Sequence, residues 1–85
     1  MLLTIKMKAK IHVTLKNGVL DPQGAAIEKS LSNLGFEGIS SIKQGKYFEV
    51  ELAEQDKNKA EQIIHDICEK LLANMVIEDF KFELV

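Results

Sequence analysis

The sequence contains no arginine, and all eleven of its basic residues are lysine. Arginine grips phosphate and carboxylate groups through two parallel hydrogen bonds, whereas lysine offers only a point charge. The absence therefore argues against a chain that binds a nucleotide or a nucleic acid by itself. The net charge of −2 and the apolar share of 46% are those of an ordinary globular protein.

Cysteine and long apolar runs are also scarce. Cys68 is the only cysteine, which excludes a disulfide framework and fits a reducing compartment. No run approaches the roughly 18 apolar residues that a membrane span requires. The first residues, MLLTIK, are too few and too poor in basic residues for a signal peptide. We therefore expect a soluble cytoplasmic protein that does not bind a membrane.

The length of 85 residues predicts one domain over residues 1–85. A domain of this size buries only about 60–65% of its unfolded surface. Its apolar burial then roughly balances the conformational entropy lost on folding. Without a disulfide or an evident metal site, such a chain often gains stability from a partner. We expect an oligomer or a subunit.

Hydrophobic periodicity predicts an α+β fold. Strict alternation over KAKIHVTLK is typical of a half-buried strand. Two later segments have apolar residues at helical spacing, the first of them at Ile27, Leu31 and Leu34, and Gly35 stands where a glycine ends a helix. In order, the expected elements are a strand over 8–16, a helix over 22–34, strands over 37–43 and 46–52 joined by a turn at Gln44–Gly45, a helix over 58–72 and a strand over 76–85. This β-α-β-β-α-β order predicts a ferredoxin-like fold, with two helices on one face of a four-stranded antiparallel sheet.

The loop NGVLDPQG, residues 17–24, lies between the first strand and the first helix. It lacks the lysine and hydroxyl of a phosphate-binding Walker loop and the three glycines of a dinucleotide fingerprint. Asp21 is expected to cap the helix, Pro22 suits its first position, and Gly18 permits a positive φ. Gly24 would cost about 1 kcal/mol inside the first turn. Either local packing or the approach of another backbone must explain it.

The second helix has two candidate caps. Asp56 is one, and Asn58, with Glu61 three residues later in a capping-box arrangement, is the other. His65 lies at four-residue spacing from Glu61 and Glu69, which is typical of a solvated charged face rather than a metal site. Cys68 has no CxxC partner and is expected to be a small buried residue.

The predicted open face of the sheet carries His12 among lysines, with Glu49 and Glu51 on a neighbouring strand. Opposite charges on adjacent strands are ordinary sheet stabilisation. RNA-binding domains of this fold stack bases on exposed aromatic residues, but here Tyr47 is followed by two carboxylates that repel phosphate. We expect neither a catalytic nor a metal site on the chain, and no nucleic-acid partner.

Four short motifs, taken in order and with their spacing, resemble the PurS family. They are GVLDPQG (18–24), LGF (34–36), QGK (44–46) and LLANMVIE (71–78). The resemblance covers the chain from about Lys8 to Leu84. In two respects the sequence departs from the family pattern. Met75 stands where the family usually has proline, which leaves the end of the second helix less defined. Residues 1–7 form an N-terminal extension, so that Met7 is an alternative start to Met1.

The PurS family comprises small subunits of phosphoribosylformylglycinamidine synthase, a purine-biosynthesis amidotransferase and ATP-dependent ligase. The resemblance implies a non-catalytic subunit that forms a homodimer or a higher homo-oligomer. It implies that this subunit joins a PurQ-type glutaminase to a PurL-type synthetase and aids ammonia transfer between them. ATP and magnesium would bind to the synthetase, and this chain would hold no cofactor. The residues expected to bind partners are Gly18, Asp21, Pro22, Gly24, Gly45, Lys46 and Asn74.

Two further hypotheses belong to other classes. One is a ferredoxin-like dimer that senses an amino acid or another small molecule, an interpretation that rests on fold analogy alone. The other is a small enzyme, for which the sequence offers no catalytic constellation. Within the assembly hypothesis, a bulky residue at position 24 is expected to weaken complex formation and to leave the isolated domain folded.

Overall fold

The computed structural model describes residues 7–85, so the predicted N-terminal extension lies outside the described residues except for Met7. The chain is α+β, as predicted. Its elements are β1 (Met7–Leu15), α1 (Pro22–Asn33), β2 (Lys46–Leu52), α2 (Lys57–Ile67), the π-helix η1 (Cys68–Leu72) and β3 (Glu78–Leu84). No helix within residues 7–85 is long and apolar enough to cross a membrane.

Within the described residues, the sheet has three antiparallel strands in the order β2-β1-β3. In the central strand, the alternation predicted for KAKIHVTLK is confirmed, because Ala9, Ile11 and Val13 are fully buried. Ile11 pairs with Phe48 of β2 and with Phe82 of β3, so an aromatic residue flanks it on each side. These rows form the apolar face of the sheet.

The predicted fourth strand over residues 37–43 and the tight turn at Gln44–Gly45 are wrong. Residues 34–45 contain neither a helix nor a strand, and Gly38 has a φ of +84° that interrupts an extended backbone. The amides of Ile42 and Gln44 donate to side-chain carboxylates at 2.8 Å rather than to a neighbouring strand. Because these donors are already satisfied locally, the segment has less need of a strand partner.

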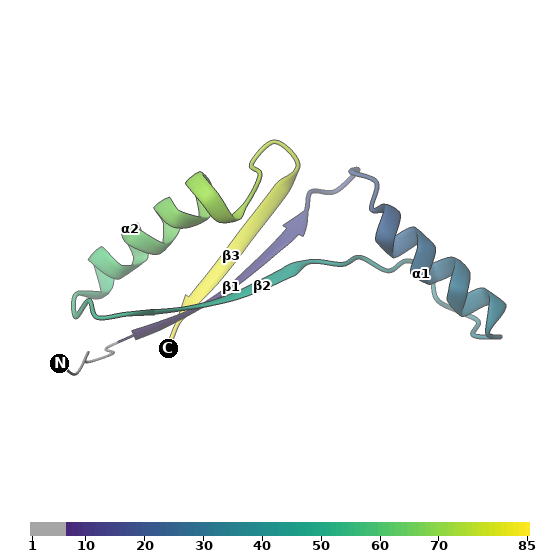
Figure 1. Cartoon of the computed structure of the whole chain (residues 1–85), viewed down its shortest axis with the longest axis horizontal. Helices are drawn as coiled ribbons and strands as arrows, with labels where there is room; N and C mark the ends of the chain where they lie inside the picture. Colours follow the sequence, from purple (N-terminus) through teal and green to yellow (C-terminus); the bar gives the residue numbers. More distant parts are fainter. Residues whose placement is uncertain (1–6) are drawn as a thin grey trace.

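Only one of the two helices covers the sheet, which corrects the predicted ferredoxin-like arrangement. Ile64 of α2 and Cys68 of η1 are fully buried and join the core on the sheet. By contrast, α1 buries a single residue, Gly24, and projects away from the sheet at the far end of the molecule (Figure 1). The principal extents are 53 × 27 × 20 Å. The radius of gyration of 17.1 Å exceeds the roughly 12 Å of a compact chain of this length.

Both ends of α1 form as the sequence predicts. The carboxylate of Asp21 accepts hydrogen bonds from the amides of Gln23 and Gly24, each at 3.0 Å. At the other end Gly35 has a φ of +91°, its amide donates to Ser32, and the amide of Phe36 donates to the Leu31 carbonyl. This pair of bonds is a Schellman motif, which ends a helix at a glycine.

The second helix begins at the cap Asp56, which accepts from the amides of Asn58 and Lys59, so the Asn58 alternative is wrong. Its last turn widens into η1, where the Ala73 amide donates to the Cys68 carbonyl at 2.9 Å. Cys68 and Ala73, five residues apart, are both buried. Ala73 is extended, at φ −117° and ψ 137°, so the helix ends before Met75 although no proline stands there.

Candidate functional site

The projecting part of the molecule, residues 16–45, is called the arm below. It consists of a loop, α1 and a returning segment over residues 34–45. Apolar side chains on the arm are exposed: Leu34 by 74%, Phe36 by 57%, Ile39 by 46% and Ile27 by 41%. Exposed apolar residues gathered on one element mark an interaction surface more often than residues scattered singly.

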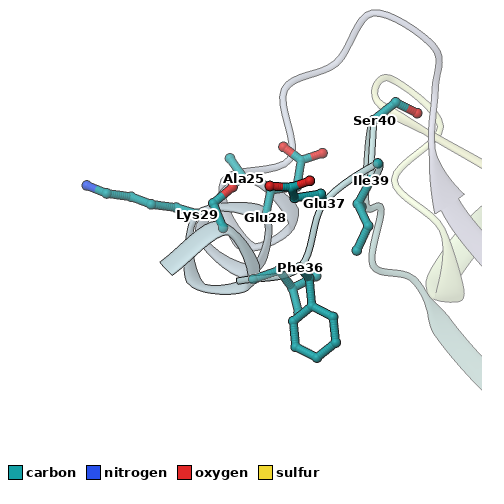
Figure 2. Close-up of a pocket in the computed structure, with 10 residues that line it drawn as sticks. Ala25, Glu28, Lys29, Phe36, Glu37, Ile39 and Ser40 are labelled. Carbon is teal, nitrogen blue, oxygen red and sulfur yellow. The ribbon is translucent and has the colours of Figure 1, made fainter. Parts of the chain in front are cut away.

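A hollow of about 540 Å³ lies between α1 and the returning segment (Figure 2). Ala25, Glu28 and Lys29 line it from the helix, and Phe36 and Ile39 line it from the segment. The hollow is open, with charged groups beside an aromatic ring and an aliphatic side chain. Such a mixture suits a protein surface better than a buried small molecule, because ligand sites are enclosed and mostly apolar.

A second hollow, the base hollow, lies where the arm joins the sheet. It measures about 170 Å³ and lies between the end of β1, the start of α1 and the start of β2. It brings together three of the residues expected to bind partners, Asp21, Gly45 and Lys46, which are up to 25 positions apart in the chain. Glu78 of β3 also lines it and was missed by the sequence analysis.

Asp21 contacts both chain segments at this base. One oxygen, Oδ1, caps α1, and the other, Oδ2, accepts from the backbone amide of Gln44 at 2.8 Å. The Gln44 amide is the largest cause of a lowered pKa for the Asp21 carboxyl, followed by the Gly24 amide. Partial burial opposes the effect, while the Gln23 amide and the charge of Lys43 support it. The carboxylate is therefore held in its charged form.

Gly24 is buried by the chain's own returning segment. A Cβ at this position would overlap the carbonyl oxygen of Ile42. One turn later, Glu28 accepts a hydrogen bond from the Ile42 amide at 2.8 Å. This contact resolves the two explanations left open by the sequence, since another backbone does approach and belongs to the same chain. The role of Gly24 in partner binding stays a prediction.

Lys46 and Asn74 are connected through Glu78. The Lys46 ammonium lies 3.7 Å from Glu78 Oε2, and the backbone amide of Asn74 donates to Glu78 Oε1 at 2.6 Å. The Glu78 side chain is only 12% exposed, whereas that of Lys46 is 60% exposed, so the pair spans the end of the sheet from β2 to β3 with its carboxylate sheltered and its ammonium in solvent. The signal that could have identified Glu78 is its place as the last residue of the LLANMVIE motif, directly after a turn.

The other two expected residues lie at the edge of this region. Gly18 has a φ of +86°, which confirms the predicted left-handed turn, and the following Val19 amide closes that turn on the Lys16 carbonyl at 3.2 Å. Pro22 is the first residue of α1 and is exposed. Neither lines the base hollow, and their role in partner binding also stays a prediction.

The other groups considered from the sequence as reactive are His12, His65 and Cys68. On the open face, His12 pairs with Tyr47 across the strands, and their rings lie 4.9 Å apart. His65 lies 3.3 Å from Glu69 on an exposed helix face, as expected. Burial raises the pKa of the Cys68 thiol. Within residues 7–85, no three His, Cys, Asp or Glu side chains converge as metal ligands.

These features define a class: a small α+β protein with a three-stranded sheet, one packed helix and one helix carried outward on an arm. Comparison with known proteins gives the particular family. The profile described as PurS, phosphoribosylformylglycinamidine (FGAM) synthase, matches residues 8–85. The chain belongs to the PurS family.

Individual relatives agree with this assignment. The chain is 44% identical over 75 residues to the phosphoribosylformylglycinamidine synthase subunit PurS of Synechocystis, covering 88% of this chain and 75% of that protein. The solved PurS of Bacillus subtilis matches with a TM-score of 0.84 and 38% identity over 93% of this chain and 98% of that one. A chain in the solved PurLQS structure from Thermotoga maritima matches with a TM-score of 0.84 and 30% identity, covering 93% and 96%.

Proposed function

We propose that this chain is the non-catalytic assembly and coupling subunit of phosphoribosylformylglycinamidine synthase. In this role it joins the glutaminase to the synthetase and aids ammonia transfer between them. Membership in the PurS family supports the proposal, as does the likeness to a chain in a solved PurLQS structure. ATP and magnesium would bind to the synthetase, and the complex would work in the cytoplasm. Residues 8–85, which the family profile matches, would act as one domain.

The observation that carries the proposal is the projecting arm. An isolated chain that holds α1 away from its own sheet leaves Leu34 and Phe36 in water. Burying apolar area contributes about 25 cal/mol per Å², so these side chains favour association over solvation. An arm of this kind suits a subunit whose task is to hold other subunits together.

The same arm supports a homodimer or a higher homo-oligomer. On the sheet, α2 covers the central row, while Phe48 of β2 and Phe80 of β3 remain half-buried. We infer that α1 of a second copy covers the part of the sheet face that α2 leaves open. The two-helix layer expected from the sequence would then form between two chains rather than within one.

The test of this interface is a matched pair of substitutions. Ile27 on α1 and Ile63 on α2 are both isoleucines on helices and both 41% exposed. We expect Ile27→Glu to weaken self-association measured by sedimentation at least about tenfold, because it introduces a charge into a buried apolar contact. Ile63→Glu should leave self-association unchanged. An equal effect of the two substitutions would contradict an interface on the arm.

The test of the coupling function is reconstitution. The cognate synthetase and glutaminase are mixed with glutamine, ATP, magnesium and formylglycinamide ribonucleotide, with and without this chain. We expect glutamine-dependent synthesis to require the chain and ammonia-dependent synthesis to proceed without it. Product formation from glutamine that is unaffected by the chain would refute the proposal.

A further inference from the structure

The direction of the arm is set by contacts at its base. Two chain segments cross from the sheet to the arm there, one leaving β1 and one entering β2. The entering segment is held against the sheet, because Gly45 lies so close to β1 that a Cβ would be 2.7 Å from the Val13 carbonyl oxygen. Gln44, the preceding residue, is thereby held at a fixed place beside the sheet.

Asp21 connects the start of α1 to this fixed place. Its two carboxylate oxygens have different tasks: Oδ1 accepts from two amides of the first helical turn, and Oδ2 accepts from the Gln44 amide 23 positions later. Helix capping alone uses one oxygen, as Asp56 shows at the start of α2, where Oδ1 accepts both bonds. The second oxygen of Asp21 therefore serves a purpose other than capping.

Further along the arm, the two segments are joined to each other and not to the sheet. Gly24 approaches the Ile42 carbonyl, and Glu28 accepts from the Ile42 amide. These contacts make α1 and the returning segment one unit. Because this unit is joined internally, its direction depends on the contacts closest to the sheet. These are the hydrogen bond that the Gln44 amide donates to Asp21 and, on the segment leaving β1, the bonds that Lys16 donates to the Ile77 carbonyl and the Asp79 carboxylate.

We propose that Asp21 is a positioning residue that holds the arm open, with α1 directed away from its own sheet and ready for a second copy. This inference deepens the homo-oligomer proposed above and rests on it. An arm already held in its bound direction loses less conformational freedom on association than a mobile one. Without the bond to Gln44, the apolar side of α1 is free to fold back on the sheet face of its own chain.

The variant that separates the two tasks is Asp21→Asn. Asparagine is as good a helix cap as aspartate, but it has a single acceptor oxygen. It therefore cannot keep the bonds to the first helical turn and the bond to Gln44 together. Asp56→Asn is the matched control, because Asp56 caps α2 in the same way and holds no second segment. Gln44→Pro is the reciprocal variant, which removes the amide donor and leaves the cap intact.

The experiment measures amide hydrogen exchange and self-association of the full chain. We expect Asp21→Asn to raise exchange at Gln44 about tenfold and to weaken self-association by a similar factor, as loss of a charge-assisted hydrogen bond does. Gln44→Pro should weaken self-association likewise, and Asp56→Asn should change neither quantity. Unchanged exchange at Gln44 in Asp21→Asn, or unchanged self-association despite faster exchange, would overturn the positioning role.

A different measurement is needed if the chain does not form a homo-oligomer. If the unmodified chain stays monomeric at every concentration, the proposed self-association is wrong, and small-angle scattering then decides the role of Asp21. A positioning role predicts that Asp21→Asn lowers the radius of gyration from the 17.1 Å of the open arm towards the roughly 12 Å of a closed chain. An unchanged radius would overturn it.

Discussion

Gly24 shows how a single missing side chain allows the arm to form. Its Cα hydrogens face the Ile42 carbonyl, where a methyl group would overlap the oxygen. We therefore expect Gly24→Ala to separate the two segments of the arm, although alanine is by itself the better helix former. Overpacking of this kind typically costs about 1–3 kcal/mol. Amide exchange should become faster over residues 23–33 and 42–44 and stay slow in β1.

The control for Gly24→Ala is Ala26→Gln, which enlarges an exposed side chain two positions later. It should leave exchange unchanged throughout the arm. Slow exchange throughout the arm in Gly24→Ala would mean that the carbonyl shifts without penalty. The same result would revive the idea that the glycine is needed only where a partner contacts it.

The charge of Asp21 predicts how the arm responds to acid. Hydrogen bonds from Gln44 and then Gly24 lower the pKa of its carboxyl in the folded chain. A lowered pKa contributes stability that is present above the ordinary aspartate value, about 3.9, and is lost as pH falls through the folded value. Protection of the Gln44 amide, corrected for intrinsic exchange, should therefore persist at pH 5 and disappear in stronger acid.

Other groups around Asp21 make a comparison necessary. Lys43 contributes to the lowered pKa of Asp21, and a second carboxylate, that of Glu78, lines the same hollow. Asp21→Asn should show little protection of Gln44 at any pH. If that variant kept an acid-dependent protection equal to that of the parent, the transition would not come from Asp21.

At the scale of elements, the turn after η1 is expected to accept proline at position 75. The amides of Ile77 and Glu78 donate to the Asn74 carbonyl, and that of Val76 donates to the Asn74 side chain. Met75 is the second residue of this turn, the position that proline favours, and its amide is not among these donors. We expect Met75→Pro to stabilise the chain by about 0.4–1 kcal/mol, because it restricts the unfolded state.

Urea unfolding of Met75→Pro and of the control Met75→Ala measures this effect. The control removes the same side chain without fixing φ. A midpoint for the proline variant below that of the alanine variant would show that the turn does not fit proline. Such a result would mean that the turn of this chain has a conformation suited to methionine and not to the proline of the family pattern.

Elements governed by local signals were predictable from the sequence. The Asp21 cap and the Gly35 ending of α1 depend on neighbouring residues, and both formed where expected. The strand predicted over 37–43 failed because strand formation needs a partner elsewhere, and here the Glu28 side chain of the arm takes the Ile42 amide. The same limit applies to helix placement. The apolar spacing of Ile27, Leu31 and Leu34 predicts that this face of α1 is buried, but it does not indicate whether the same chain or another one buries it.

The candidate site was predictable in part for the same reason. The loop residue Asp21 could be identified as a cap, but its second bond joins residues 23 positions apart, which no local pattern reveals. Glu78 was missed because its ion-pair partner, Lys46, is distant in the sequence and reaches it only when β2 and β3 flank β1. The sequence motifs identified the segments that form the base of the arm, but the hydrogen bonds and ion pair between them could be recognised only in the folded chain.

The whole molecule is long for its size because a third of its residues, 16–45, lie in the arm. The core is correspondingly small: it is built around Ile11, Val13 and Ile64, with half-buried aromatic residues at its margin. Small domains of this kind are marginal on their own. The elongated shape and the small core thus both favour a chain that gains stability by associating with other subunits.

The irregular segment that returns from α1 gives assembly a simple reporter. Phe36 lies in that segment, 57% exposed and outside any helix or strand, which is the type of site that proteases cut first. Chymotrypsin should therefore nick the dilute chain after Phe36 and spare Tyr47, which is 49% exposed but lies in β2. Once partners cover the arm, the nick should disappear. The rate of a single cleavage would then follow subunit assembly without any label on the protein.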